Sequence, residues 1–354
     1  MKHYKITMKL LSPVHIGTGK DYEPINYVMD KKLVTKQNGS KSEQAFLYNF
    51  DEMDFFNKLD QKQKDEFSKR ADNIFSLYNF IKENKIQAIK ASFCKVDVLD
   101  DYFKEYEEKL GKVVQKEGGG KKVFNKFTIA KTFKNPNTHK AIIPGSSIKG
   151  AISTAYQELL YKKSKDYDEV KAKMLAPTEQ NLFKDLLISD SQEFAQTYID
   201  KAQNIKRKKD KAQNIKRKKD KEGLPAALEV ISDANAENSF TLSIKDNAKF
   251  SIKDLADACN DHYELIFNTI FDDKAHQYID NEFFNLDEHL QINENQFLLR
   301  VGQHSGARAV TVDGIRQIKL IQGKSQSKIA DEESTIWLIN KKPFGWILCT
   351  YEEI

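Results

Sequence analysis

The opening residues of the chain alternate between apolar and polar side chains. Apolar side chains occupy every second position, at Tyr4, Ile6, Met8 and Leu10. Because successive side chains of a strand point to opposite faces, this alternation predicts a half-buried β-strand. Pro13, Gly17 and Gly19 follow, and they predict that the strand ends in a turn.

Two later regions show the three-to-four-residue spacing of amphipathic helices. Residues 51–110 carry apolar side chains at this spacing between charged positions, and we expect them to be helical. A second helix has the clearest pattern, with Ser146 or Ser147 as its N-cap. Its apolar face consists of Ile148, Ala151, Ile152, Ala155, Tyr156, Leu159 and Leu160.

The rest of the chain alternates between strand-like and helix-like patterns. The expected elements are a hairpin at 25–48, an apolar segment at 186–189, strands at 226–231 and 240–244, helices across 252–290, a glycine-bearing loop at 302–314, and β-like segments at 335–339 and 345–351. Strands at both ends with helices between them predict an α+β sandwich in which the terminal strands pair.

The composition excludes several classes of protein. The chain has 354 residues, with 40% hydrophobic and 31% charged side chains, which is enough for two domains of ordinary size. No apolar run approaches the roughly 20 residues that a bilayer requires, and the polar start lacks the apolar core of a secretion signal. We therefore expect a cytoplasmic protein with no membrane partner. Three widely separated cysteines have neither disulfide-framework nor zinc spacing, so we expect no metal and no other cofactor.

Positive charge is concentrated in one segment. The net charge is +5, but residues 201–222 contain 11 basic and 3 acidic residues, and the remainder of the chain has a net charge of −3. This segment holds a perfect tandem repeat, KAQNIKRKKD at 201–210 and again at 211–220. Such a repeat cannot keep an apolar stripe along a helix, because the second copy is rotated by roughly 80°. The segment is interpreted either as a solvated insertion or as a polycationic arm that grips a phosphate backbone.

Residues 111–140 form a second basic region. They hold eight lysines, among them Lys131 and Lys134, together with one glutamate and a run of three glycines. Phe124, Phe127 and Phe133 lie among the lysines. We interpret the region as a basic loop or hairpin that projects from the body, with aromatic side chains suited to stacking on unpaired bases.

The sequence IIPGSSIKGAIST, residues 142–154, predicts an anion-binding helix start. After Pro144 and Gly145 the first helical turn directs unpaired backbone N–H groups outward, and such a terminus attracts anions. This turn contains Lys149 and no acid, which suits a lysine closing over a bound phosphate. The alternative is an ordinary capped helix with a solvated lysine. The spacing does not match the GxxxxGK[ST] of a nucleotide-binding loop.

Arginine is rare and clustered. The chain has 51 lysines and 6 arginines, and Arg300, Arg308 and Arg316 fall within 17 residues, beside glycines. The planar guanidinium suits bidentate recognition of phosphate or carboxylate, so the cluster predicts either phosphate binding or internal salt bridges.

Isolated histidines and acids leave a catalytic alternative open. His15 follows the first strand and would suit a general base for RNA cleavage, although a histidine in this apolar setting more often supports the structure. His139 and His304 lie in basic or glycine-bearing loops and would suit stacking on RNA. Asp21 and Asp30 would serve a metal-dependent nuclease only if further carboxylates converged on them.

Six segments, taken in order, resemble the RAMP superfamily, the RNA-binding subunits of CRISPR effector complexes. They are LSPVHIGTG near the start, IPGSSIKGAI, LLISDS at 186–191, ALEV at 227–230, the glycine loop near 302–306 and PFGW at 343–346. The resemblance covers nearly the whole chain, and IPGSSIKGA is its most diagnostic motif. LISDS and the chain length make it most specific for the family of fifth subunits of the type III-A (Csm) complex.

The resemblance implies an RRM/ferredoxin-like fold with two ferredoxin-like halves, inserted helices and a basic insertion. We expect an N-terminal domain at 1–190 that includes the helical insertion and the basic loop. A basic linker would follow at 191–225, and a C-terminal domain at 226–354.

The resemblance also implies a non-catalytic protein that binds crRNA, caps its 3′ side and contributes to complex assembly and crRNA 3′-end maturation in antiviral defence. The expected partners are crRNA, the repeated backbone RAMP subunit and the small subunit, with target RNA and host 3′-trimming nucleases left open. The alternative is a RAMP ribonuclease that uses His15 or a metal. The expected RNA-binding residues are His15, Gly17, Gly19, Lys131, Lys134, Gly145, Ser146, Ser147, Lys149, Arg300, Gly302, His304, Gly306 and Arg308.

Overall fold

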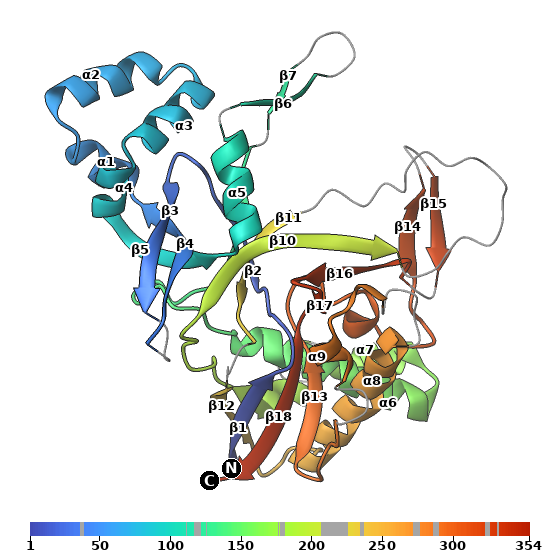
Figure 1. Cartoon of the computed structure of the whole chain (residues 1–354). Helices are drawn as coiled ribbons and strands as arrows, with labels where there is room; N and C mark the ends of the chain where they lie inside the picture. The colour runs from blue at the N-terminus through green and yellow to red at the C-terminus, as the bar shows by residue number, and fades with distance from the viewer. Residues whose placement is uncertain are drawn as a thin grey trace.

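A computed structural model of the chain shows two β-sheets with helices packed on their faces (Figure 1). The structure describes residues 1–35, 39–110, 112–116, 122–124, 126–175, 177, 181–206, 226–233, 237–271, 277–285, 290–322, 326–330 and 333–354. In these ranges no helix is both long enough and apolar enough to cross a bilayer. The mixed α and β architecture that the sequence predicts is confirmed.

Both ends of the chain meet in a five-stranded sheet, so the predicted pairing of the terminal strands is confirmed (Figure 1). The first strand, β1, pairs antiparallel with β18 on one side and with β12 on the other. The strand order is β13 (Gln296–Arg300), β18 (Trp346–Glu353), β1 (Lys2–Leu10), β12 (Glu237–Ile244) and β9 (Leu186–Ile188).

The main core lies between this sheet and two long helices, α6 (Gly145–Ser164) and α8 (Ile252–Phe271). All four apolar side chains of the β1 alternation are buried in it, and Ile6 and Met8 have no exposed surface. The predicted apolar face of α6 packs into the same core, with Ile148 and Ile152 almost fully buried. Each large apolar side chain buried in this way stabilises the fold by about 1.5–3 kcal/mol.

The second sheet combines strands from most of the chain. Its order is β2 (Gly17–Tyr22), β8 (Ile129–Thr132), β11 (Ala226–Ile231), β10 (Thr197–Lys206), β5 (Ser92–Val98), β4 (Lys41–Phe50) and β3 (Tyr27–Thr35), with β16 (Thr335–Ile339) paired to β10 and β17 (Lys342–Pro343) paired to β16. Strands from both sides of residues 191–225 occur in each sheet, so strand pairing crosses the division of the chain that the sequence suggests.

The β3–β4 hairpin expected at 25–48 is confirmed, and both of its faces are covered. On one face Tyr27 and Leu47 share a core with Tyr106 of α5 (Asp100–Lys109). On the other face Phe46 and Phe50 pack against a group of four helices that we call the helical lobe. The lobe consists of α1 (Glu52–Asn57), α2 (Gln61–Arg70), α3 (Ile74–Glu83) and α4 (Lys85–Ala91).

Several shorter elements complete the described structure. They are α7 (Tyr167–Met174), α9 (Asn281–Phe284), the 3-10 turns Leu182–Asp185 and Arg308–Val310, the hairpin of β6 (Val113–Lys116) and β7 (Lys122–Phe124), and the hairpin of β14 (Ile318–Gln322) and β15 (Gln326–Ala330). The β6–β7 hairpin projects from the body, as expected for part of the basic region (Figure 1).

Three local expectations are wrong. Residues 51–110 are not helical throughout, because β5 lies within them and pairs with β4 and β10. Residues 17–22 form β2 rather than a simple turn. Phe127 cannot stack on a base in this structure, because it is 2% exposed and packs against Tyr102 and Tyr106.

The basic repeat begins as structure rather than as linker. Residues 201–206 belong to β10, where Ala202 and Ile205 are buried and pair with Ile339 and Ile336 of β16. Ile336 and Ile339 come from a distant part of the chain and provide apolar strand partners for these residues. Residues 201–206 are therefore a buried strand, and the interpretation of them as helical or solvated is wrong. The remainder of the repeat, 207–220, lies outside the described residues.

Candidate nucleic-acid interface

The glycine-bearing loop at 302–314 begins at a buried arginine. Arg300, at the end of β13, is 3% exposed. Its Nε donates to the carbonyl oxygen of Phe344 at 3.0 Å, and its guanidinium lies 4.9 Å from the centre of the Trp346 ring. These contacts stabilise the fold and favour the internal role that the sequence left open for Arg300.

The other two arginines of the cluster also have internal partners. Arg308 donates its Nη1 to Thr269 Oγ1 at 3.2 Å and its backbone N–H to Glu333 Oε2 at 3.1 Å. Arg316 lies 3.2 Å from Asp313 Oδ1 in an ion pair. The cluster therefore stabilises the glycine-bearing loop, and phosphate binding by Arg300 and Arg308 stays a prediction.

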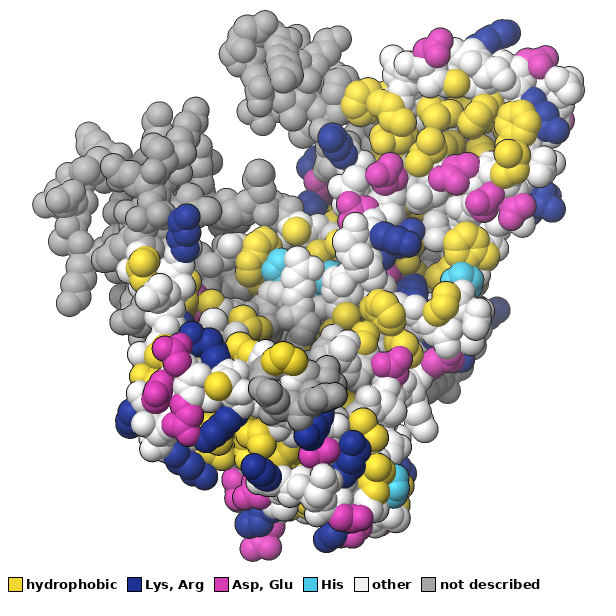
Figure 2. Space-filling view, turned by 180° about the vertical axis from the view of Figure 1, so that it is seen from behind, with side chains coloured by type: hydrophobic (Ala, Val, Ile, Leu, Met, Phe, Trp, Pro, Cys, Tyr) yellow, Lys and Arg dark blue, Asp and Glu magenta, His cyan; other side chains and the backbone are white. Residues whose placement is uncertain are grey.

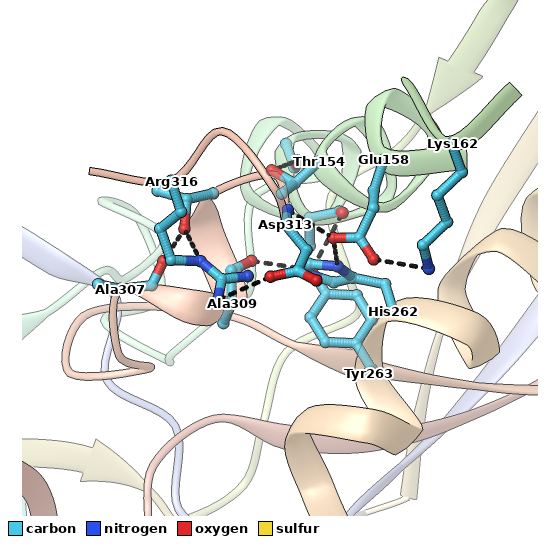
Figure 3. A network of polar contacts seen from close by, with 12 residues as sticks. Thr154, Glu158, Lys162, His262, Tyr263, Ala307, Ala309, Asp313 and Arg316 are labelled. Carbon is cyan, nitrogen blue, oxygen red and sulfur yellow. Dashed lines mark hydrogen bonds and ion pairs between the residues drawn. The ribbon is translucent and has the colours of Figure 1, made fainter. Parts of the chain in front are cut away.

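A buried carboxylate anchors the far end of this loop (Figure 3). Glu158 of α6 accepts a hydrogen bond from the Asp313 N–H at 3.0 Å, and its Oε2 lies 2.7 Å from Nδ1 of His262 on α8. Lys162 pairs with its other oxygen at 2.9 Å. Burial raises the pKa of the Glu158 carboxyl, but these partners outweigh it and lower the pKa to about 2. The ionised form of Glu158 thus ties the loop to both long helices.

A side chain of the same chain accepts a hydrogen bond from the backbone at the start of α6. The helix begins at Gly145 with Pro144 as N-cap and no side-chain cap, so the prediction that Ser146 or Ser147 caps it is wrong. The N–H of Gly145 donates to Asp190 Oδ1 at 2.8 Å. A carboxylate at this N-terminus is the arrangement that the helix dipole favours, and it occupies the place expected for a phosphate.

Lys149 also has internal partners at this helix start. Its Nζ donates to the carbonyl oxygens of Phe183 and Leu186, both at 2.7 Å. Burial lowers the pKa of Lys149. The side chain fastens α6 to the 3-10 turn Leu182–Asp185 and to the first residue of β9, and a contact of Lys149 with RNA stays a prediction.

His15 is fully buried beneath the glycine-bearing loop. Its Nδ1 lies 2.7 Å from the carbonyl oxygen of Glu229, and burial lowers its pKa. Gly302 has φ of +87°, and a Cβ there would lie 2.4 Å from the His15 carbonyl oxygen, so only glycine fits. The rings of His15 and His304 stack with centroids 6.4 Å apart, and burial together with this neighbour lowers the pKa of His304 to about 4.

Cationic and aromatic side chains gather in a hollow of about 560 Å³, which we call the basic hollow. It opens where β2 and β8 meet the start of β5 and the loop that follows β8. Phe93 and Phe133 on its wall are 50% and 37% exposed, so their rings are available to a ligand. The cations and rings that line it are Lys20, Lys131, Lys134, Tyr22, Phe93, Phe133 and His139.

The floor of the basic hollow is a buried charge network. Glu229 has no exposed surface, and its carboxylate lies 2.6 Å from Lys134 Nζ. It also accepts hydrogen bonds from the hydroxyls of Tyr22 at 3.0 Å and Thr197 at 2.8 Å. Lys131 lies 4.4 Å above the Tyr22 ring, and burial lowers its pKa. With Glu229 neutralised in this way, the hollow presents a net positive wall to solvent.

A second hollow of about 310 Å³ adjoins the first, and we call it the side hollow. The two share Phe93, Cys94, Lys134 and His139, and the side hollow adds Lys95 and Lys140. Together they give a run of lysines with interleaved aromatic rings, which is the pattern of a surface that binds single-stranded nucleic acid.

A groove elsewhere in the described part of the chain has the opposite charge. It has a volume of about 1080 Å³ and lies where the end of β1 and the start of β12 face β4 and β5. Lys9 and Lys342 are its cations, and Lys342 is paired with Asp233 at 2.8 Å. Its acids are Glu43, Asp97, Asp100, Asp233, Glu237 and Glu282. An acidic groove repels a polyanion, so the basic hollow and the side hollow are the better candidates for a nucleic-acid interface.

The acids proposed for a metal-dependent nuclease are far apart in the sheet order. Asp21 belongs to β2 and Asp30 to β3, which are at opposite ends of the seven-strand path of the second sheet. Asp30 pairs with Lys85 at 2.6 Å. In the described part of the chain, no three His, Cys, Asp or Glu side chains gather as metal ligands do.

The expected RNA-binding residues lie in three places, of which the first and the third adjoin, because Gly17 lies against Gln303 of the glycine-bearing loop. Gly17, Lys131 and Lys134 lie at the basic hollow, and Gly19 lies beside it on β2. The start of α6 contains Gly145, Ser146, Ser147 and Lys149. The third place, the glycine-bearing loop and its support, contains His15, Arg300, Gly302, His304, Gly306 and Arg308.

Sequence reasoning missed Lys20, Phe93, Lys95 and Lys140 as members of the interface. Phe93 and Lys95 lie in a region that the sequence predicted to be helical. The sequence therefore did not indicate that they belong to β5, a strand that pairs with β10. The sequence did contain one usable signal, the density of lysines around 131–140, because Lys131, Lys134 and Lys140 line the two hollows.

The chain is similar to known proteins, both in a family model and in fold. A family model described as the RAMP superfamily matches residues 7–277. A chain of the Csm–crRNA–target RNA ternary complex of a type III-A CRISPR-Cas system, solved by cryo-electron microscopy, is similar in fold, with a TM-score of 0.66, 16% identity, and coverage of 99% of this chain and 100% of that one. Crystalline Csm5 of T. onnurineus is also similar, with a TM-score of 0.53, 14% identity, and coverage of 96% and 99%. No protein of curated function matches at the level of sequence.

We expect Glu158→Gln to destabilise the protein by about 1–3 kcal/mol at pH 7, because His262 and Lys162 lose an ionised partner. The folded-state pKa of about 2 lies below the ordinary value of 4.5, so the stabilisation is complete above pH 4.5 and is lost as pH falls toward 2. Urea unfolding of both proteins between pH 7 and pH 2.5 measures this difference.

The control for this measurement is Glu169→Gln on α7, where the carboxylate is about half exposed. It should change stability by less than about 0.5 kcal/mol at any pH. If the gap between Glu158→Gln and the wild type were the same at pH 7 and pH 2.5, Glu158 would not be ionised in the folded protein.

Proposed function

The chain belongs to the RAMP superfamily, and on that premise we propose that it is a crRNA-binding subunit of a type III-A (Csm) CRISPR complex. In this proposal it caps the 3′ side of the guide, contributes to assembly of the complex and to maturation of the guide 3′ end, and has no catalytic role. The similarity in fold to a chain of a Csm–crRNA–target RNA complex and to Csm5 supports this choice within the superfamily.

The observation that carries the proposal is the basic hollow. Lys20 and Lys131 stand on adjacent strands at its rim, and Phe133 offers a partly exposed ring beside them. Lysines supply affinity for a phosphate backbone and aromatic rings supply stacking for unpaired bases, without reading sequence. Binding of this kind suits a guide whose sequence differs from one complex to the next.

The composition of the surface of the helical lobe favours contact with another protein. Figure 2 shows hydrophobic side chains gathered over this lobe, with charged side chains around them. Met53 of α1 and Ile86 of α4 are 66% and 62% exposed. Apolar patches of this kind mark protein–protein contacts, and we propose the repeated backbone RAMP subunit or the small subunit as the neighbour. Target RNA and host 3′-trimming nucleases are further proposed partners of the assembled complex.

The positions of the possible catalytic groups support a non-catalytic role. His15 is buried, its Nδ1 faces a backbone carbonyl, and burial lowers its pKa. A general base must come within hydrogen-bond reach of the proton that it removes, and this side chain has no exposed surface from which to do so.

Replacing Lys20 and Lys131 together by alanine should weaken binding of single-stranded RNA on the order of tenfold at low salt. The slope of log affinity against log salt should fall by roughly 0.7 for each lysine that neutralises a phosphate. Fluorescence anisotropy with a labelled 12-nucleotide RNA at four salt concentrations measures both quantities.

The matched control is Lys62→Ala with Lys69→Ala, two exposed lysines of α2. It should change neither affinity nor slope. Lys134 is left in place, because its removal would leave Glu229 buried without its cation and destabilise the fold by about 3–5 kcal/mol. Equal affinities for the Lys20, Lys131 variant and the wild type at every salt concentration would contradict the assignment of this hollow.

Complexes assembled without this chain should carry guides with altered 3′ ends. The physical reason is that a subunit lying on the 3′ side covers those nucleotides or positions the nuclease that trims them. Purification of the remaining complex followed by sizing of its RNA measures the effect. Guides of unchanged length would contradict the proposed role in maturation. Failure of the chain to co-purify with the complex would contradict the proposed role in assembly.

The purified chain should leave labelled RNA intact with and without Mg²⁺, because the structure gives His15 no access to substrate. Gel analysis of the RNA over several hours provides the measurement. Cleavage that disappears in His15→Ala or Asp30→Ala would establish the ribonuclease alternative instead.

A further inference from the structure

Two aromatic rings stand at the junction of the basic hollow and the side hollow. Phe93 and His139 line both hollows, and their ring centroids lie 4.8 Å apart with 43° between the planes. The two hollows therefore meet at this ring pair.

Phe93 is the exposed ring of the pair, and His139 is half-buried. Phe93 is 50% exposed and shares its face of β5 with Lys95 and Asp97, while Val96 and Val98 on the other face are almost fully buried. A half-exposed phenylalanine forgoes part of the stabilisation that full burial would contribute. Its exposure beside a positively charged wall is explained if a ligand covers the ring in the functional state.

The backbone of His139 is held in a conformation that an L-residue adopts at a cost. Its φ is +56°, in the left-handed region. The short loop that carries it is closed by two backbone hydrogen bonds, from Asn135 to Lys140 and from His139 to Asn135, both at 2.9 Å. The loop is thus built to present the His139 ring against Phe93. Residues held in this conformation concentrate at sites that clamp ligands.

Lysines stand on both sides of the ring pair. The basic hollow has Lys20 and Lys131, and the side hollow has Lys95 and Lys140. Lys140 is 3.6 Å from Glu193, and Asp97 also lines the side hollow, so the positive charge there is weaker than in the basic hollow. Volumes of about 560 and 310 Å³ fall in the range of sites for small organic groups, roughly 300–1,000 Å³.

We propose that the two hollows hold two successive unpaired nucleotides of a bound RNA, one on each side of the Phe93–His139 ring pair. The bases stack against the rings, and the lysines of each hollow neutralise the phosphates. This inference rests on the proposed function, because it takes single-stranded RNA as the ligand. It adds that the chain splays two neighbouring nucleotides apart at one defined place instead of holding a continuous base stack.

Stacking of bases on Phe93 predicts a loss of affinity that does not depend on salt, unlike the loss of a charged contact. Phe93→Ala should lower the affinity for a labelled 12-nucleotide RNA by about tenfold, since base–aromatic stacking contributes about 1–3 kcal/mol per base and 1.4 kcal/mol is tenfold. The salt slope should stay unchanged, because no cation is removed. Phe93→Tyr keeps the ring and should bind as the wild type does.

Two further variants control for structural effects. His139→Gly removes the second ring while keeping the left-handed backbone available, and it should also lower the affinity without changing the salt slope. Tyr278→Ala removes an aromatic side chain that is 47% exposed and does not line either hollow, and it should have no effect. Thermal unfolding of each variant shows whether it is folded.

Crosslinking tests the geometry directly. RNAs with 4-thiouridine at each single position are bound to the full chain and irradiated, and the crosslinked peptides are identified. We expect crosslinks to peptides that contain Phe93 and His139 from two adjacent positions, and loss of these crosslinks in Phe93→Ala.

The outcomes separate this inference from the proposed function. If the wild type binds RNA and Phe93→Ala binds equally well, the two-nucleotide site is wrong and RNA binding stands. A loss of affinity in Phe93→Ala together with a lower salt slope would also overturn it, because the ring would then act through the lysines. If the wild type binds no RNA even at 50 mM salt, the proposed function itself fails.

Discussion

One buried carboxylate determines the shape of the surface on which RNA binding is proposed. Glu229 of β11 has no contact with solvent, and a charge there is tolerated because Lys134, Tyr22 and Thr197 all donate to it. These donors come from the loop after β8, from β2 and from β10, so neutralising one carboxylate holds four distant segments together. The backbone carbonyl of the same residue receives His15, on which the glycine-bearing loop rests.

The pairing of charges decides which surface suits a polyanion. The arginines of the cluster and Lys149 are engaged by side chains and carbonyls of the chain itself, although their residue types suit phosphate. The groove between the end of β1 and the strands β4 and β5 is lined mainly by acids. Lysines lie beside exposed aromatic rings at the basic hollow and the side hollow, and this combination is the reason that single-strand binding is proposed there.

Patterns that depend on burial of one face were predicted correctly. The alternation of β1 and the apolar face of α6 both identify buried residues, because an apolar stripe has to be covered whatever covers it. Features that depend on a particular pairing partner elsewhere in the chain were not predicted from the sequence. β5 sits between β4 and β10, and the start of the basic repeat became a strand because β11 and β16 pair with it. The N-cap of α6 was misplaced because its acceptor, Asp190, lies 45 residues away.

The sequence by itself determined the α+β architecture, the pairing of the two terminal strands, the resemblance to the RAMP superfamily and the region around Lys131 and Lys134 as a basic surface. Hydrophobic periodicity, motif order and local charge density are properties of neighbouring residues, and they can be read without coordinates. Only the tertiary structure decided which cations stay available. A lysine or arginine looks the same in a sequence whether it faces solvent or a carbonyl, and the group that pairs with it is supplied by the fold.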